Sequence, residues 1–567
     1  MLNMNKNRTI LFSYLVPFLF FLACAPMKSA REEKTQDADF TKLDIMASQR
    51  MLGLDFTAEE IDTMYNYLLR NRANYDTMRT FPLDYSDLPV IQFNPHPTGF
   101  QVSVDQKPVT WKIPDDVSLP EDSNDLAFYS VMELAALVQS QQITSVQLTQ
   151  FFLKRLKKYD PILKAVITLT EDRAMKSAHQ ADEEITAGNY RGPLHGIPYG
   201  VKDIIAVEGY KTTWGSEPYK DQVIEETATV VKKLDAAGAV LVAKLTSGAL
   251  ARGDVWFGGK TISPWDTTQG SSGSSAGPAA ATAAGLVPFA LGTETWGSIV
   301  SPSTRCGVTG LRPTYGRVSR TGVMVLSWSM DKVGPICRSA TDCAIVFDTI
   351  RGKDKKDPTT TEASFNNFWA SPGQELRVGY LEEAFKKDTT DSGANGRAAL
   401  AVFTNMGIEL KPVKLPEDFP FRTFDIILRA EAGAFFDELL LSNRDDLMVE
   451  QTKRSRVNSL RQSRFIPAVE YLQANRHRGR LIEAMHELMK DYDVIISPQR
   501  GGNQTLITNL TGHPALSIPA GFDKKGRPTS IILVGNLYDE ASLLEVARKF
   551  QKETDFESAH PPLFSGS

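Results

Sequence analysis

The chain has 567 residues, of which 42% are hydrophobic, and a formal net charge of −5. This length exceeds one average domain, and the apolar content is enough for a large core, so we do not expect a disordered protein. The charge shows no basic excess, and we therefore expect no nucleic acid partner.

Residues 1–24 have the pattern of an export signal. Lys6 and Arg8 precede an apolar stretch that is about as long as a signal-peptide core and short for a bilayer span. The stretch ends in Phe-Leu-Ala-Cys, which resembles the bacterial lipobox, so we expect Cys24 to carry lipid. The predicted location is the cell envelope or periplasm, with membrane attachment through that lipid. An ordinary signal peptide cut nearby, or an uncleaved anchor, is the alternative.

Residues 25–125 are expected to form a tether followed by a helical extension. The first part is charged and polar, as flexible tethers are. A helix is predicted at 57–79, because Thr57 and Glu60 have the spacing of a capping box and apolar residues recur at helical spacing after them. The stretch 82–120 is rich in proline and has little periodicity, which predicts an ordered strap.

Helical and strand patterns alternate from residue 126 onward, which predicts one large α/β domain at 126–567. Helices end where proline or glycine interrupts the pattern, one before Pro161 and another at Gly188. Short apolar runs between them predict buried strands. The predicted helices are 146–159, 171–187, 230–237, 428–441 and 468–491, and the predicted strands are 239–243, 377–381, 494–496 and 531–534.

The remaining cysteines predict inert thiols. If Cys24 carries lipid, then Cys306, Cys337 and Cys343 are left, and an odd number leaves at least one thiol free. All three have apolar surroundings, which favours burial, and a bridge between Cys337 and Cys343 is the alternative. No Cys/His pair has metal-site spacing, and we expect neither a metal nor a cofactor.

Two serines and a lysine in glycine-containing segments can make a nucleophile without histidine. A serine hydroxyl needs a base, and none of the seven histidines lies in the loops of Ser274 or Ser298. A lysine can act as the base if burial lowers its pKa from about 10.4. Lys202 follows an apolar run that suits the end of a buried strand. The alternative is a surface lysine paired with Asp203.

These segments, together with others downstream, resemble the amidase signature family. Its members hydrolyse or transfer the acyl group of carboxylic amides. The likeness begins near residue 126 and continues to the C-terminus. It implies an α/β fold with a mixed central β-sheet covered by helices on both faces, here preceded by an N-terminal helical extension.

The resemblance also implies a role for each residue of the triad. Ser298 would be the nucleophile, Lys202 the base, and Ser274, after a cis peptide bond, the bridge between them. Aligning the helix that follows places Ser274 at the bridging position, 24 residues before Ser298. Ser275 and Gly273 would support the loop.

The nucleophile segment departs from the family pattern at three positions. Glu294 replaces an aspartate, Trp296 a glycine and Val300 an arginine. A tryptophan beside the oxyanion site would narrow the acyl pocket or form its wall, and Val300 removes a charge. Backbone N–H groups would stabilise the oxyanion of the tetrahedral intermediate. The predicted donors are Thr295, Trp296, Gly297 and Ser298.

Other interpretations of the same residues lead to different functions. Residues 273–277 also match Gly-x-Ser-x-Gly, the nucleophile elbow of α/β-hydrolase esterases. That motif needs a strand directly before it, whereas the sequence 263–270 predicts a loop. An esterase acting through the same triad is a second alternative. Because of Trp296, a catalytically silent binding relative is a third.

The sequence therefore predicts an amidase that converts a carboxylic amide into an acid and ammonia or an amine through an acyl-enzyme on Ser298. The expected substrate is a small-molecule or peptide amide. A role in tRNA amidation fits poorly with an exported chain, because it needs partner subunits and cytoplasmic tRNA.

Overall fold

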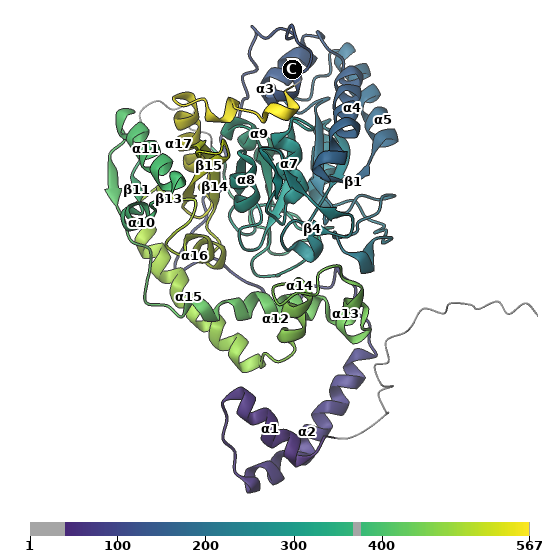
Figure 1. Ribbon diagram of the computed structural model, residues 1–567, viewed down its shortest axis with the longest axis vertical. Coiled ribbons are helices and arrows are strands. Elements are labelled where there is room, and N and C mark those ends of the chain that lie inside the picture. Colours follow the sequence, from purple (N-terminus) through teal and green to yellow (C-terminus); the bar gives the residue numbers. More distant parts are fainter. Residues whose placement is uncertain (1–39, 367–375, 566–567) are drawn as a thin grey trace, which may run out of the picture. The chain divides into compact units, whose positions relative to one another are not determined.

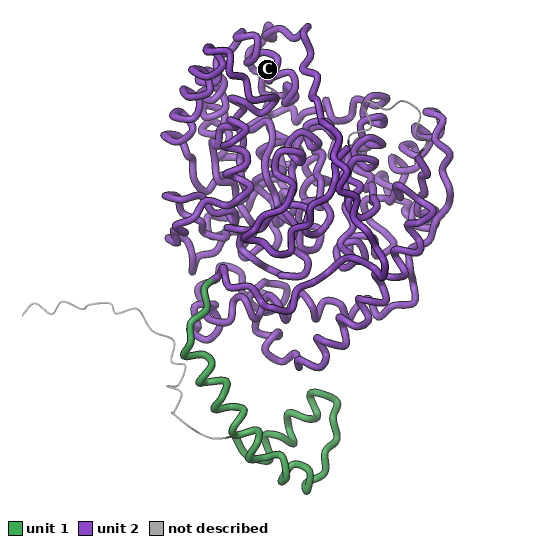
Figure 2. The backbone as a smooth tube through the Cα atoms, turned by 180° about the vertical axis from the view of Figure 1, so that it is seen from behind, with its two compact units in different colours: residues 1–84 green, residues 85–567 purple. Residues whose placement is uncertain are grey.

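The computed structural model describes residues 40–366 and 376–565. The chain forms two compact units, residues 1–84 and 85–567 (Figure 2). The signal at 1–24, its Cys24 and most of the predicted tether lie outside the described residues. No helix within 40–366 or 376–565 is long and apolar enough to cross a membrane.

The first unit contains two helices, α1 (Lys42–Leu52) and α2 (Ala58–Arg79). The predicted capping box of α2 is confirmed, because the Thr57 side chain accepts from the Glu60 N–H and the Glu60 carboxylate accepts from the Thr57 N–H. Helix α1 was not predicted. It begins with the same device, formed by Thr41 and Asp44.

The second unit is built on a mixed sheet of eleven strands. Strand β2 pairs in parallel with β3 and β8, and β11 pairs in parallel with β12 and β13, whereas the other pairs are antiparallel. The mixed sheet predicted above is therefore confirmed. In spatial order the strands are β1 (Val166–Leu169), β3 (Val240–Leu245), β2 (Pro198–Lys202), β8 (Phe289–Glu294), β10 (Lys332–Cys337), β9 (Thr309–Arg312), β14 (Ala515–Phe522), β15 (Pro528–Gly535), β13 (Val494–Pro498), β11 (Val378–Tyr380) and β12 (Leu410–Pro412).

Helices cover both faces of this sheet (Figure 1). The alternation along β15 shows it: Ile532 packs against Val300 of α8, while Leu533 belongs to the large core that contains Leu543 of α17. The helices of this unit are α3 (Val131–Gln139), α4 (Ser145–Leu163), α5 (Glu171–Thr186), α6 (Thr229–Ala236), α7 (Ala276–Ala283), α8 (Val300–Cys306), α9 (Ala340–Ile350), α10 (Glu382–Lys387), α11 (Asp391–Asn405), α12 (Asp425–Phe435), α13 (Asp437–Leu441), α14 (Arg456–Ser463), α15 (Ala468–Met489), α16 (Gln504–Thr511) and α17 (Glu540–Lys552).

Three predicted boundaries were wrong. Helix α4 continues through Pro161, because a proline in the last turn removes only one intrahelical hydrogen bond. The helix predicted at 428–441 is two helices that meet at Phe436. The loop predicted at 263–270 is a small hairpin, in which β6 (Ile262–Ser263) pairs with β7 (Asp266–Gly270) around a Pro-Trp turn.

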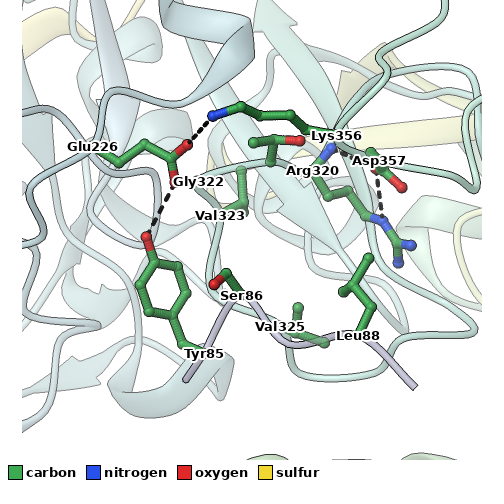
Figure 3. A pocket seen from close by; sticks show the side chains of 11 residues that line it. Tyr85, Ser86, Leu88, Glu226, Arg320, Gly322, Val323, Val325, Lys356 and Asp357 are labelled. Carbon is green, nitrogen blue, oxygen red and sulfur yellow. Dashed lines mark hydrogen bonds and ion pairs between the residues drawn. The ribbon is translucent and has the colours of Figure 1, made fainter. Parts of the chain in front are cut away.

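The proline-rich strap belongs to the second unit from Tyr85 onward. The Tyr85 hydroxyl donates to the Glu226 carboxylate at 3.2 Å, and Lys356 lies 3.3 Å from the same carboxylate. Figure 3 shows these contacts around a cavity of about 300 Å³ that Ser86 and Leu88 also line. The strap is thus an ordered segment without long regular structure.

The three described cysteines are free and buried, as predicted. Burial raises the pKa of the Cys306 thiol well above its usual range, which disfavours the reactive thiolate.

Candidate active site

Lys202 lies at the C-terminal end of β2, between β3 and β8. Its side chain is completely buried, which confirms the predicted buried strand end. The alternative of a surface lysine paired with Asp203 is wrong. Asp203 instead forms an ion pair of 2.9 Å with Lys244 of β3.

The Lys202 amine faces two hydroxyl groups and no carboxylate within ion-pair distance among the described residues. Its Nζ lies 2.8 Å from Ser274 Oγ and 2.8 Å from Thr293 Oγ1. Burial lowers the pKa of Lys202 to about 7, although the charges of Asp331 and Glu294 work in the opposite direction. Much of the amine is therefore neutral near pH 7 and can accept a proton.

Ser274 follows a cis peptide bond to Gly273, at the position that the resemblance implied. The loop has no room for a side chain before Ser274, because a Cβ on Gly273 would lie 1.8 Å from the carbonyl oxygen of Gly253. Ser274 is 1% exposed, so its hydroxyl meets Lys202 away from bulk water.

Ser275 joins this loop to the other two predicted segments. Its hydroxyl donates to the Thr293 carbonyl at 3.0 Å and accepts from the Thr293 N–H at 3.1 Å. Its own N–H donates to the Ser298 carbonyl at 3.1 Å. The loop of Ser274 is thereby held against both β8 and the segment of Ser298.

Ser298 lies in the short connection between β8 and α8. The Glu294 carboxylate closes this connection, because it accepts from the N–H groups of Ile299 at 2.8 Å and Val300 at 3.0 Å. Gly297 has φ of +94°, in the region that favours glycine. Among the described residues, no acceptor pairs with the backbone N–H groups of Thr295, Trp296, Gly297 and Ser298. They are thus left free for a ligand oxygen.

Glu294 is a buried structural anion. Burial alone raises its pKa, but Arg312, Lys332 and the Val300 N–H outweigh that effect and bring the pKa to about 2. Arg312 Nη1 donates to Glu294 Oε1 at 2.8 Å, and both side chains are fully buried. The charge at Glu294 therefore holds the shape of the connection.

Asp331 and Thr293 were missed from the sequence. The Thr295 hydroxyl donates to Asp331 Oδ1, and the N–H groups of Leu326 and Ser327 donate to Asp331 Oδ2 at 2.6 and 3.0 Å. Asp331 thus orients the first residue of the Ser298 connection. Thr293 precedes Glu294 in the same glycine-containing segment, so its place was a usable signal, whereas Asp331 comes from another strand segment and gave none.

A cavity of about 450 Å³ opens beside Ser298. Gly273, Thr295 and Trp296 line it with Ser298, so Trp296 forms part of the wall, as one of the two sequence-based expectations held. Val300 lies elsewhere: it packs with Ala515 and Ile532. The charge that the family pattern places at this position is replaced here by an apolar contact.

The nucleophile-elbow interpretation fails on the contacts of its serine. The strand β7 ends at Gly270, in a separate two-stranded sheet, and Ser275 uses its hydroxyl on the backbone of Thr293. All seven histidines lie among the described residues, and none of them hydrogen-bonds to Ser274, Ser275 or Ser298. His513, for example, is buried against Thr511, and burial lowers its pKa to about 3.

A protein-family model described as Amidase matches residues 147–544. The chain belongs to the amidase signature family. Among curated relatives of this family member is a subunit of the glutamyl-tRNA(Gln) amidotransferase of Acinetobacter baumannii, which is 33% identical over 485 residues, or 76% of this chain and 97% of that protein. The same subunit of Thioalkalivibrio sulfidiphilus is 34% identical over 77% of this chain and 99% of that protein.

Solved structures agree with this assignment. The peptide amidase of Stenotrophomonas maltophilia matches with a TM-score of 0.66 and 28% identity, over 77% of this chain and 98% of that one. The mixed α/β architecture described above is thus the fold of the family, and the chain is an amidase-family enzyme.

Proposed function

We propose that this enzyme hydrolyses carboxylic amides through Ser298, with Ser274 as the proton relay and Lys202 as the base. The observation that carries the proposal is the Lys202 amine: it is fully buried, its pKa is about 7, and it lies 2.8 Å from the Ser274 hydroxyl. A base with a pKa near the working pH is the kind that general base catalysis needs.

Bond formation and proton transfer balance as follows. Ser298 Oγ bonds to the amide carbonyl carbon while its proton passes to Ser274, whose own proton passes to Lys202. The C–N bond then breaks, and the proton returns through Ser274 to the departing nitrogen, which leaves as ammonia or an amine. Water attacks the resulting ester by the same relay, and the acid leaves with Ser298 restored.

The free N–H groups of residues 295–298 support the same assignment. During both attacks the carbonyl oxygen becomes negatively charged, and preorganised donors stabilise that charge. One such donor is worth about 3 kcal/mol of the barrier in other acyl-transfer enzymes. The Glu294 contacts to Ile299 and Val300 keep these donors in place.

The test is covalent labelling together with product analysis. A fluorophosphonate probe should label Ser298, and a panel of primary amides, anilides and peptide amides should yield acid and amine. Ser298→Ala should lose both, whereas Ser177→Ala on α5 should lose neither. Absence of label and turnover in a folded protein would favour the silent binding relative, and faster turnover of matched esters would favour an esterase with the same triad.

A second function is favoured by the names of the curated relatives, which are subunits of glutamyl-tRNA(Gln) amidotransferases. An enzyme of that kind would release ammonia from an amide and deliver it to a second reaction in a complex. Glutamine as the only amide accepted from the panel would favour this function. Hydrolysis of other amides by the isolated chain would favour the amidase.

We also infer that the protein is exported and lipidated at Cys24. The support is the sequence alone: Lys6 and Arg8, the apolar stretch and the Phe-Leu-Ala-Cys end. Mass analysis of the mature N-terminus should find a lipid on Cys24, and Cys24→Ala should abolish it. An unprocessed N-terminus in the cytoplasm would contradict export.

A further inference from the structure

The walls of the cavity beside Ser298 carry far more positive than negative charge. The only acidic residue among those lining it is Asp425, which already forms a 2.7 Å ion pair with Arg429. The basic residues lining the cavity are Arg252, Arg429, Lys453, Arg454 and Arg456.

Arg456 is the most unusual of these residues because it is only 5% exposed. Its Nε and Nη2 donate to the carbonyl oxygens of Leu250 at 3.0 Å and Ala251 at 3.2 Å, and Nη1 has no partner among the described residues. Buried charges are normally paired with an opposite charge. Here both partners are neutral, so the guanidinium charge is not compensated by the chain.

Arg252 makes this imbalance worse. Burial and the charge of Arg252 lower the pKa of Arg456 to about 9, which reports that the site disfavours its own positive charge. The side chains of Arg252, Lys453 and Arg454 form no hydrogen bond or ion pair with any residue in the described part of the chain. An anion in the cavity would relieve this repulsion and find several free donors.

We propose that the cavity selects amides that carry a second, negatively charged group such as a carboxylate, held by Arg456 and Arg252 while the amide lies at Ser298. Guanidinium groups bind planar anions through paired N–H donors. The field of the basic wall also raises the local concentration of anionic molecules. This inference rests on the proposed amide hydrolysis and names the substrate class for the same cavity.

The first experiment compares amides matched in length. Succinamate, glutaramate and adipamate carry a carboxylate where butyramide, valeramide and hexanamide carry a methyl group. We expect kcat/KM to be at least about tenfold higher for one or more of the anionic members than for its neutral partner, and the ratio to fall as salt is added. Equal or reversed values throughout the three pairs would overturn the inference while leaving the hydrolase intact.

The second experiment measures binding without turnover, on Ser298→Ala protein by calorimetry. The anionic amides should bind, the neutral amides should bind at least about tenfold more weakly, and Arg252→Gln should weaken anion binding about tenfold. Arg480→Gln, on exposed α15 surface outside the cavity, is the matched control and should change nothing. Binding that ignores both the ligand charge and Arg252→Gln would overturn the inference.

These two measurements separate the two proposals. Anion-selective binding without hydrolysis by the wild-type protein would refute the hydrolase and keep the charged subsite. Arg456→Gln adds a direct test if it folds, and Arg252→Gln serves in either case because its side chain is exposed.

Discussion

Lys202 and Lys244 lie on neighbouring parallel strands, and both side chains are completely buried, yet their surroundings differ in one respect. Lys244 has a carboxylate partner, Asp203, at 2.9 Å. Lys202 meets only the hydroxyls of Ser274 and Thr293. Burial lowers the pKa of both lysines, but at Lys244 the adjacent Asp203 charge raises it back towards its usual value.

The comparison teaches that burial alone does not make a base. A carboxylate partner stabilises the ammonium form and turns the lysine into a structural cation, whereas hydroxyl partners leave it able to exchange a proton. The difference between the two sites can be broken or sharpened by changing each lysine, the solution pH and each hydroxyl in turn.

The largest expected effect is that of Lys202→Met. It removes the proposed base, and we expect kcat/KM for amide hydrolysis to fall on the order of 10⁴-fold, as in other serine hydrolases that lose a triad member. Circular dichroism should show a folded protein. Activity within tenfold of wild type would contradict the role of Lys202.

Lys244→Met should act on stability rather than on catalysis. It leaves Asp203 buried without its cation, and breaking a buried ion pair in this way costs about 3–5 kcal/mol of unfolding free energy. Urea denaturation measures this loss, and kcat/KM of the folded fraction should stay within about tenfold. The double variant Lys244→Met/Asp203→Asn should recover part of the stability. A loss below about 1 kcal/mol would show that the pair is not what distinguishes this site.

The pH dependence of kcat/KM reports the state of Lys202. Its pKa of about 7 means that the amine is protonated, and inactive as a base, below that value and neutral above it. We therefore expect kcat/KM to rise about tenfold per pH unit below pH 7 and to level off above it. A rate that still rises steadily up to pH 10 would indicate a lysine with an ordinary pKa, as on a protein surface.

The smallest expected effect is that of Thr293→Val, which removes one of the two hydroxyls that face Lys202. Loss of one hydrogen bond should lower kcat/KM about tenfold. The midpoint of the pH profile should also move to lower pH, because the ammonium form loses an acceptor. Thr212→Val is the matched control: Thr212 accepts from Lys244, so this change should leave the profile in place. An unchanged profile in both variants would exclude a positioning role for Thr293.

Local patterns predicted much of the scaffold. Alternating helices and short apolar strands indicated the α/β class, and the capping box at Thr57 located the start of α2. The errors arose where local rules compete. Proline does not end α4 in its last turn, and the polar segment 266–270 forms a strand because a tight turn lets it pair with β6.

The triad residues could be named in advance because each lies in a distinctive short segment, and Lys202 could be expected at a buried strand end because apolar residues precede it. The residues that act on them were less accessible. Asp331 reaches Thr295 from another strand segment, and the basic wall combines Arg252 with residues more than 150 positions later in the chain.

By itself, the sequence determined the helix and strand patterns, the glycine-containing loops and the three side chains that can form a serine nucleophile, because these depend on neighbours along the chain. Only the tertiary structure decided that Asp203 pairs with Lys244 and leaves Lys202 to two hydroxyls, and that the wall beside Ser298 is basic. Such pairings depend on which strands lie side by side and which segments share a cavity, and no local periodicity encodes them.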